Sequence, residues 1–181
     1  MINIKQLRTK GALQQVPNKP GYYKWWANQD DFKTIIDKLD VQYGTIEPYL
    51  DKSADDALIC IYIGIAAKES LRKRLDWHIN DPHTESRVKN GTLSTLRQSI
   101  SSVIKGNQFD KDATNDFMNR LYIEWFEIDA PIKSEKAKME LHTVECTAMK
   151  NYLYVLNIQD NKHKAAKPIK TQLKLIRKKS K

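Results

Sequence analysis

The sequence predicts one mixed domain of α-helices and β-strands that carries a basic C-terminal tail. Three short runs rich in β-branched and aromatic residues are typical of strands, and they lie at residues 22–27, 57–65 and 121–128. The segments between them carry apolar residues at helical spacing, so we expect the strands to be separated by amphipathic helices. With 181 residues, 40% of them hydrophobic, the chain can form a substantial core, which argues against wholesale disorder.

The first predicted strand, residues 22–27, follows a turn-forming Pro-Asn-Lys-Pro-Gly sequence at residues 17–21. Residues 28–57 separate it from the second strand and are expected to be an insertion. Within this insertion, apolar residues at helical spacing predict a short helix at residues 31–39. Residues 41–49 are expected to form a loop or a weak hairpin.

The second predicted strand, residues 57–65, is an almost unbroken apolar run, which favours a central position in a sheet. A basic helix is predicted directly after it, at residues 68–80, and Pro82 ends the helical segment. The two elements together place a tyrosine and a glycine at the end of a buried strand beside a group of positive charges.

One face of the basic helix carries Arg74 and His78 beside an apolar stripe. Positions 71, 74, 75 and 78 share this face because side chains three and four residues apart are neighbours on a helix, whereas Arg72 and Lys73 point elsewhere. A guanidinium at the edge of a core requires an anion. Two partners remain open: a structural carboxylate, or a phosphate whose oxygens match the fork of donors.

The longest predicted helix, residues 134–152, has a glutamate inside its apolar face. Glu145 lies one turn after Leu141 and one turn before Met149, so we expect its carboxylate to be buried and either paired, protonated or bound to a cation. One interpretation is an ion pair with Arg74. The other is a Mg²⁺ site, because a single carboxylate with several waters is sufficient when a substrate phosphate completes the shell.

Two further helices are predicted at residues 92–105 and 112–120. The polar face of the first is expected either to contact DNA or to face solvent, and it consists of Thr92, Ser94, Thr95, Arg97 and Gln98. The histidines at positions 83 and 163 are expected at the surface. The tryptophans at positions 25, 26 and 77 are expected in the core or on the sheet.

The net charge of +9 is concentrated at the C-terminus. Residues 161–181 contain nine Lys and Arg and no Asp or Glu, which leaves 22 basic against 22 acidic residues in residues 1–160. A polybasic segment suits a polyanion, nucleic acid first and an acidic membrane second, or it serves as a solvated end that aids solubility. We expect a tail that is mobile when free and helical when bound.

The two cysteines and the N-terminus indicate a cellular compartment. Cys60 and Cys146 lie inside apolar runs, which indicates buried free thiols in a reducing compartment, with a disulfide or a metal-binding pair as the alternative. The first ten residues lack the apolar core of a signal peptide, and no stretch approaches 18 apolar residues. These features predict a soluble cytoplasmic protein with no membrane partner.

Several short motifs occur in the order that is found in the GIY-YIG nuclease superfamily, which the chain resembles over about residues 20–158. Gly21-Tyr22-Tyr23 is followed by Tyr62-Ile63-Gly64 and then by an arginine on the next helix. Aligning the leucines that flank this arginine identifies it with Arg74 rather than Arg72. His78 stands where nuclease members with a histidine one turn later carry it.

The C-terminal half of the resemblance is a glutamate followed by an asparagine. The twelve-residue step from Glu145 to Asn157 is similar to that of the family, and it selects Glu145 over Glu140. The chain departs from the family pattern at Tyr22, where the middle of the first motif is usually smaller, and in the long link formed by residues 28–57.

The resemblance implies a small three-stranded antiparallel sheet flanked by helices, in a nuclease domain at residues 1–160 that precedes the polybasic tail at residues 161–181. It implies a metal-dependent DNA endonuclease, a hydrolase of phosphodiester bonds that uses one divalent cation, Mg²⁺ or Mn²⁺, held by Glu145. The alternative is a catalytically silent nucleic-acid-binding protein of the same fold. Cutting both strands would require a homodimer on DNA or two sequential nicks.

The same resemblance assigns roles to the other site residues. Tyr23 or Tyr62 is expected to take a proton from water, and one of them needs a lowered pKa to do so at pH 7. Arg74 would stabilise the charge on the phosphate, and His78 would orient the tyrosine or relay its proton. Asn157 would tie the segment after the long helix to the site by side-chain hydrogen bonds.

Overall fold

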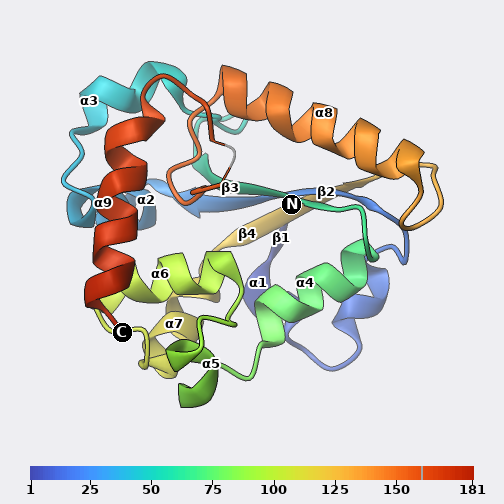
Figure 1. Cartoon of the computed structure of the whole chain (residues 1–181), viewed down its shortest axis with the longest axis horizontal. Coiled ribbons are helices and arrows are strands. Elements are labelled where there is room, and N and C mark those ends of the chain that lie inside the picture. The colour runs from blue at the N-terminus through green and yellow to red at the C-terminus, as the bar shows by residue number, and fades with distance from the viewer. Residues whose placement is uncertain (160) are drawn as a thin grey trace.

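A four-stranded sheet with helices on both faces forms the centre of the protein (Figure 1). The computed structural model describes residues 1–159 and 161–181. The strands are β1 (Ile2–Asn3), β2 (Gly21–Asn28), β3 (Leu58–Ala66) and β4 (Tyr122–Glu127). The helices are α1 (Ile4–Leu7), η1 (Ala12–Gln15), α2 (Gln29–Lys38), α3 (Tyr43–Ile46), η2 (Glu47–Tyr49), α4 (Leu71–Asn80), α5 (Glu85–Lys89), α6 (Thr95–Lys105), α7 (Lys111–Met118), α8 (Glu135–Asn151) and α9 (Ala166–Lys179). The predicted mixed α and β fold class is confirmed.

The strand order is β1-β4-β2-β3, and every neighbouring pair is antiparallel. The three predicted strands are all present, and the two-residue β1 adds a fourth. The central position predicted for residues 57–65 is wrong, because β2 lies in the middle and β3 at the edge. The outer side of β3 is nevertheless occupied: the amide of Cys60 donates to the carbonyl of Asp51 (2.8 Å), and the amide of Leu156 donates to that of Ile61 (3.0 Å). This covered edge explains why an edge strand can be almost entirely apolar.

A bulge in β3 changes which side of the sheet its residues face. Trp25 lies opposite Tyr62 and Trp26 lies opposite Cys60, so Ile61 is an extra residue on β3. Residues directly opposite each other share a face of the sheet. Tyr62 therefore joins Trp25 on one face although Cys60, two residues earlier, joins Trp26 on the other.

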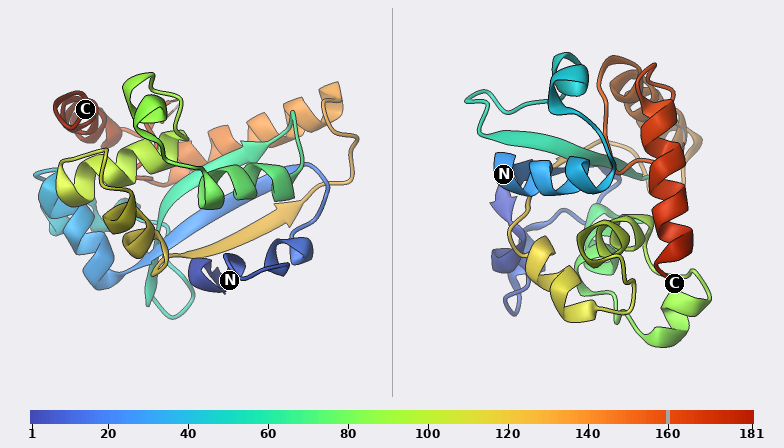
Figure 2. Two further views of the ribbon diagram at one scale, coloured as in Figure 1. Left: turned by 90° about the horizontal axis from the view of Figure 1, so that it is seen from below. Right: turned by 90° about the vertical axis from the view of Figure 1, so that its left-hand side faces the viewer.

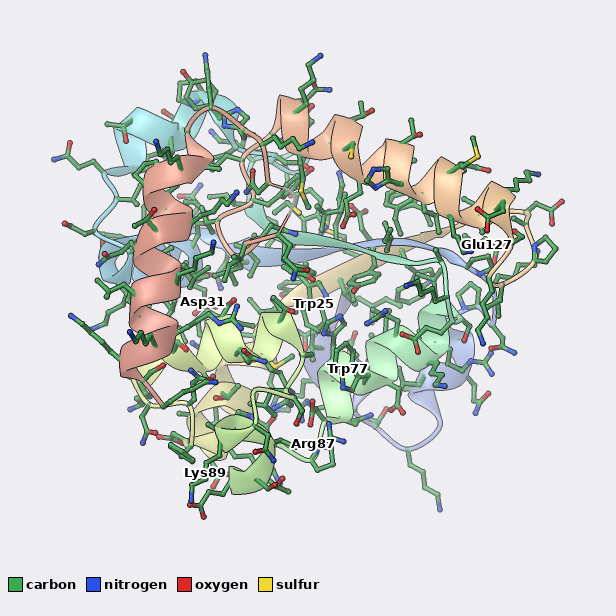
Figure 3. All side chains as sticks on the ribbon, in the orientation of Figure 1. Trp25, Asp31, Trp77, Arg87, Lys89 and Glu127 are labelled. Atoms are coloured by element: carbon green, nitrogen blue, oxygen red, sulfur yellow. The ribbon has the colours of Figure 1, made fainter. Side chains whose placement is uncertain are left out.

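The two faces of the sheet are covered by different helices (Figures 1 and 2). The larger core lies on the side of α4 and α6 and contains Trp25, Leu75 and Ile100. The opposite face is covered by α8, where Trp26 and Met149 belong to a second cluster. In Figure 3 the labelled Trp25 and Trp77 lie on the α4 and α6 side of the sheet.

Two predicted loops contain short helices. The predicted helix at residues 31–39 is present as α2, but residues 41–49 form α3 and η2 in place of a loop or hairpin. Pro48 stands in the first turn of η2, where its missing N–H is tolerated. The polar residues 81–91 contain α5, whose N-cap Thr84 accepts from the amide of Arg87.

The predicted N-cap of α8, Ser134, accepts from the amide of Ala137.

The expectation of a mobile C-terminal tail is wrong. Ile169 and Leu173 of α9 are buried, and α9 packs along α6. Side chains four residues apart lie on one face of a helix, so these residues form an apolar stripe between the lysines. The end of α9 is tied down as well, because the side chain of Gln108 donates to the carbonyl of Arg177 (2.7 Å) and to the hydroxyl of Ser180 (3.0 Å).

The remaining compositional expectations concern cysteines and membranes. Cys60 is a buried free thiol, and Cys146 is free but only partly buried, which excludes a disulfide between them. Among residues 1–159 and 161–181, no helix combines the length and the apolar character that crossing a membrane requires.

Candidate active site

A pocket of about 250 Å³ brings together the six residues that the sequence singled out. They come from five parts of the chain, namely β2, β3, α4, α8 and the segment after α8, and they are Tyr23, Tyr62, Arg74, His78, Glu145 and Asn157. A larger hollow of about 640 Å³ lies between α2 and residues 40–43 and contains none of the six. The smaller pocket is therefore the candidate site.

The two glycines of the motifs make room for the tyrosines and strands. Gly64 lies opposite Tyr23 across the β2–β3 ladder, and a Cβ at Gly64 would collide with the hydroxyl and ring of Tyr23. A Cβ at Gly21 would collide with the carbonyl oxygen of Phe126 on β4. Any larger residue at either position would displace the site or the sheet.

Tyr23 and His78 are hydrogen-bonded in the floor of the pocket, with 2.7 Å between the Tyr23 hydroxyl and Nε2 of His78. Both side chains are buried, with exposed fractions of 2% each. Nδ1 of His78 is buried and has no hydrogen-bond partner among the residues that the structure describes. Burial, then the charges of Arg74 and Arg97, lower the pKa of His78 to about 3, so the imidazole is neutral at pH 7.

Both tyrosines have pKa values above the ordinary range. Burial raises the pKa of Tyr62 to about 12, with Glu145 adding to the effect and Arg74 opposing it. Burial also raises the pKa of Tyr23, and the neighbouring Tyr62 raises it further. Arg74 alone does not lower either tyrosine pKa below its ordinary value, because loss of hydration in the interior outweighs its attraction. Without a bound metal ion, both hydroxyls hold their protons at neutral pH.

The side chain of Arg74 lies at the pocket between a carboxylate and an indole. Its Nε is 2.8 Å from Oε1 of Glu69, and its guanidinium carbon lies 5.1 Å from the centre of the Trp77 ring. Arg72 points away from the pocket, because its Nε donates to the carbonyl of Val16 (2.9 Å). The helix-face argument therefore separated the two arginines correctly. A carboxylate partner was one of the two alternatives for Arg74, and the structure contains one. Its identity as Glu69 was not predicted, since Glu69 precedes the helix and its direction depends on the loop.

Glu145 lies on the pocket wall and is partly buried, in contrast to the full burial expected from the apolar face of α8. Its charge contributes to the raised pKa of both tyrosines, which places the carboxylate near their hydroxyls. Within the described residues, no group of three or more His, Cys, Asp and Glu side chains is arranged to bind a metal ion. Mg²⁺ does not need such a group, because it commonly uses one or two carboxylates, waters and substrate phosphates. The donors present fit that mode.

Asn157 completes the edge of β3 next to the pocket. Its Oδ1 accepts from the amide of Ile63 (3.0 Å), and its Nδ2 donates to the carbonyl of the same residue (2.8 Å). The amide side chain thus occupies the place of a neighbouring strand. This pair of bonds fixes the middle of the Tyr62-Ile63-Gly64 motif and holds the segment after α8 against the site.

A buried arginine behind the site was not anticipated. Arg97 of α6 is 1% exposed, and it donates to the carbonyls of His78 (2.8 Å) and Ile79 (2.9 Å) at the end of α4. Neither expectation for this polar helix face, DNA contact or solvent, holds for Arg97. A sequence with serines and threonines around an arginine does not reveal that a helix end will lie opposite it.

The surface positions expected for His83 and His163 are wrong. His83 is buried, and its ring nitrogens contact the carbonyl of Gln108 (2.6 Å) and Nη1 of Arg97 (3.0 Å). His163 is buried against the ring of Tyr49, with 4.9 Å between the ring centres. Both are held by contacts between segments that are distant in the sequence.

One of the comparisons with known proteins identifies a family for this chain. The family model described as the GIY-YIG catalytic domain matches residues 21–179. Neither the curated proteins nor the solved structures contain a match. The matched range includes both glycine and tyrosine motifs, the basic helix, α8 and all of α9. The chain belongs to the GIY-YIG catalytic-domain family, which is a nuclease-type family.

Proposed function

We propose that the protein is a DNA endonuclease that depends on a divalent metal ion and hydrolyses phosphodiester bonds in the pocket described above. The observation that carries this proposal is the meeting of three kinds of group in one pocket: a hydrogen-bonded tyrosine and histidine, an arginine, and a carboxylate. Phosphodiester hydrolysis requires an acceptor for the proton of water and positive charge beside the phosphate.

Arg74 would bind the non-bridging oxygens of the scissile phosphate. A guanidinium matches phosphate geometry with two parallel donors, and Trp77 limits the directions in which it can swing. Glu69 holds this guanidinium in the structure, so a bound phosphate competes with Glu69 or shares Arg74 with it.

Tyr23 is the candidate acceptor of the proton from water. Because its hydroxyl is protonated at neutral pH, it takes a proton from water only as it passes its own to Nε2 of His78, which is neutral and within hydrogen-bond distance. The charge that develops on His78 is opposed by burial and by Arg74. A phosphate bound to Arg74 would offset the repulsion between the Arg74 charge and the protonated imidazole. Substrate binding would therefore favour proton transfer from Tyr23 to His78. Tyr62, on the same pocket, is the competing acceptor.

Glu145 is the residue that would hold Mg²⁺ or Mn²⁺. The ion supplies positive charge to the phosphate and to the leaving oxygen when it is bound. Glu145 is only partly buried and lines the pocket, which supports its assignment as the residue that would meet the cation.

Two further parts of the proposal concern how the protein assembles on DNA and where in the cell it is found. One pocket of this kind cuts one strand at a time, so we propose a homodimer on DNA or two sequential nicks for double-strand cleavage. The free thiols of Cys60 and Cys146 fit a reducing compartment, and we propose a cytoplasmic location.

Incubation of the pure protein with supercoiled plasmid and Mg²⁺ tests the proposal. We expect the wild type and Glu140→Ala to cut the plasmid and Glu145→Ala to lose activity. Glu140 is the matched control because it is exposed on the same helix and does not line the pocket. Equal behaviour of the wild type and Glu145→Ala at every salt and metal concentration contradicts the proposal. DNA binding without any cleavage supports the silent alternative instead.

A further inference from the structure

The C-terminal helix α9 has two faces of opposite character. Ile169 and Leu173 are buried against the protein. Four lysines repeat at intervals of three or four residues on a separate face, and we call them the lysine stripe: Lys167, Lys170, Lys174 and Lys178. At 1.5 Å of rise per residue the stripe extends for about 16 Å, which corresponds to roughly five base pairs of duplex DNA.

The positive charge of residues 161–181 is not offset by acidic residues of the same segment. These residues contain nine Lys and Arg and no Asp or Glu. Residues 1–160 are formally neutral, so the whole excess charge of the protein lies in residues 161–181, six of whose nine basic residues belong to α9. This segment would therefore attract a partner of opposite charge.

The stripe is held at a fixed place. Gln108 and Ser102 bind Ser180 at the end of α9, and the Ser180 and Ser102 hydroxyls are 2.9 Å apart. At the other end, the ring of Tyr49 packs at a tilt of 54° against the ring of His163, and Nζ of Lys164 lies 4.7 Å from the centre of the same tyrosine ring. Tyr49 belongs to the inserted residues 28–57, so one structural effect of the insertion is to support the start of α9.

The stripe adjoins the candidate active site. Asn157 of the pocket is linked to Asn161, whose Nδ2 donates to the Asn157 carbonyl (3.3 Å), and Nζ of Lys170 donates to the carbonyl of Asn161 (2.8 Å). A groove of about 490 Å³ lies directly beyond, lined by Asn161, Lys162, His163, Lys167, Lys170, Thr171 and Lys174. Near the other end of α9, the side chain of Arg177 donates to Gln98, and its charge acts on the hydroxyl of Tyr62.

We propose that the lysine stripe of α9 is a second phosphate-binding surface, which holds the backbone of the same nucleic acid whose scissile phosphate lies in the pocket. The inference rests on the proposed nuclease function. Nucleic acid fits better than a lipid surface, because the apolar stripe of α9 is already buried in the protein and does not insert into a membrane interface. The spacing of the lysines along a straight rod also suits the regular phosphates of a duplex.

Three lysines of the stripe are exposed and can be neutralised without disturbing the core, whereas deletion of α9 would also remove the buried Ile169 and Leu173 and uncover α6, on which the helix packs. The test variant is therefore Lys167→Gln with Lys174→Gln and Lys178→Gln. The matched control removes the same charge from three exposed lysines elsewhere, Lys5→Gln with Lys10→Gln and Lys38→Gln. Thermal unfolding of both variants should match that of the wild type.

Binding of a short DNA duplex is measured in the presence of a chelator, over a range of KCl concentrations. A plot of log affinity against log salt concentration has a negative slope, and each lost phosphate contact makes it shallower by about 0.9. We therefore expect the slope of the stripe variant to be shallower than that of the wild type by roughly 2 to 3. Its affinity near 0.1 M salt should fall by about tenfold or more. The control variant should keep the wild-type slope, and the stripe variant should still cut at saturating DNA concentrations.

A stripe variant that binds with the affinity and slope of the control overturns the inference while leaving the nuclease function intact. A wild type that neither binds nor cuts DNA overturns the proposed function and the inference together. Vesicles that contain phosphatidylserine form the third arm. If the stripe is needed for vesicle binding and not for DNA binding, the surface is a membrane contact and the proposal is wrong.

Discussion

Tyr23 and His78 are 55 residues apart in the sequence, and the Tyr23 hydroxyl and Nε2 of His78 lie 2.7 Å apart in the buried floor of the pocket. One residue comes from the middle strand of the sheet and the other from a helix that covers it. Because each of these side chains is almost fully buried, removing one leaves a polar atom of the other unsatisfied. The pair therefore links the stability of the fold to the chemistry of the site.

Tyr23→Phe removes the hydroxyl from this pair. We expect the single-turnover cleavage rate to fall by roughly 10²–10⁴, the usual contribution of a positioned proton acceptor. The free energy of unfolding should fall by about 1–3 kcal/mol, because the buried imidazole loses its partner. Tyr22→Phe is the control, since Tyr22 stacks on Phe126 and does not line the pocket. If Tyr23→Phe cuts normally and Tyr62→Phe does not, Tyr62 is the proton acceptor.

The lowered pKa of His78 predicts a pH dependence of stability. The imidazole has a pKa near 6.5 when unfolded and about 3 when folded, so between these values the unfolded chain binds the extra proton. The free energy of unfolding is therefore highest above pH 6.5, where His78 is neutral in both states. It decreases as the pH falls toward 3, by up to about 1.4 kcal/mol per pH unit. Urea unfolding of the wild type and His78→Gln across this range isolates the effect. If the free energy of unfolding depends on pH in the same way in both proteins, the prediction is wrong.

If Arg74 binds the scissile phosphate as proposed, Glu69 is expected to compete with that phosphate for the guanidinium. Glu69→Gln removes the negative charge that holds the guanidinium, so we expect DNA to bind roughly two- to fivefold more tightly, the factor that corresponds to a partly exposed ion pair of up to about 1 kcal/mol. Equilibrium binding in a chelator measures this change. Glu85→Gln, which breaks an exposed pair with Lys89, should have no effect. Weaker binding by Glu69→Gln would mean that Glu69 positions Arg74 for the phosphate.

Gly64→Ala tests the close approach of the two tyrosine motifs. The added methyl group collides with the ring of Tyr23, and we expect a loss of about 1–3 kcal/mol in stability together with reduced cleavage. Gly44→Ala is the control, because its Cβ would meet nothing within 4 Å and its backbone is helical. Thermal unfolding compares the two. A stable and active Gly64→Ala variant would show that Tyr23 can move without loss.

Local patterns predicted a large part of the fold. The strands at residues 22–27, 57–65 and 121–128 and the helix α8 are recognisable because burial on a strand or a helix imposes a short repeat on the sequence. Turn residues and caps such as Ser134 set their ends. The expectations of a mobile tail and of exposed His83 and His163 were wrong because these positions depend on contacts between distant segments.

By itself the sequence determined which chemical groups the site contains and which arginine faces it, because the helical period places Arg74 and His78 on one side of α4 and sends Arg72 to the other. Only the tertiary structure decided how those groups are arranged. The extra residue Ile61 turns Tyr62 toward Tyr23, and Arg97 closes the end of α4 beneath His78. The docking of α9 likewise converts a run of lysines into a stripe beside the pocket. The physical reason is that the spacing of apolar residues determines which face of a single helix or strand is buried. The positions of bulges, buried ion pairs and docked helices depend instead on contacts with other elements of the fold.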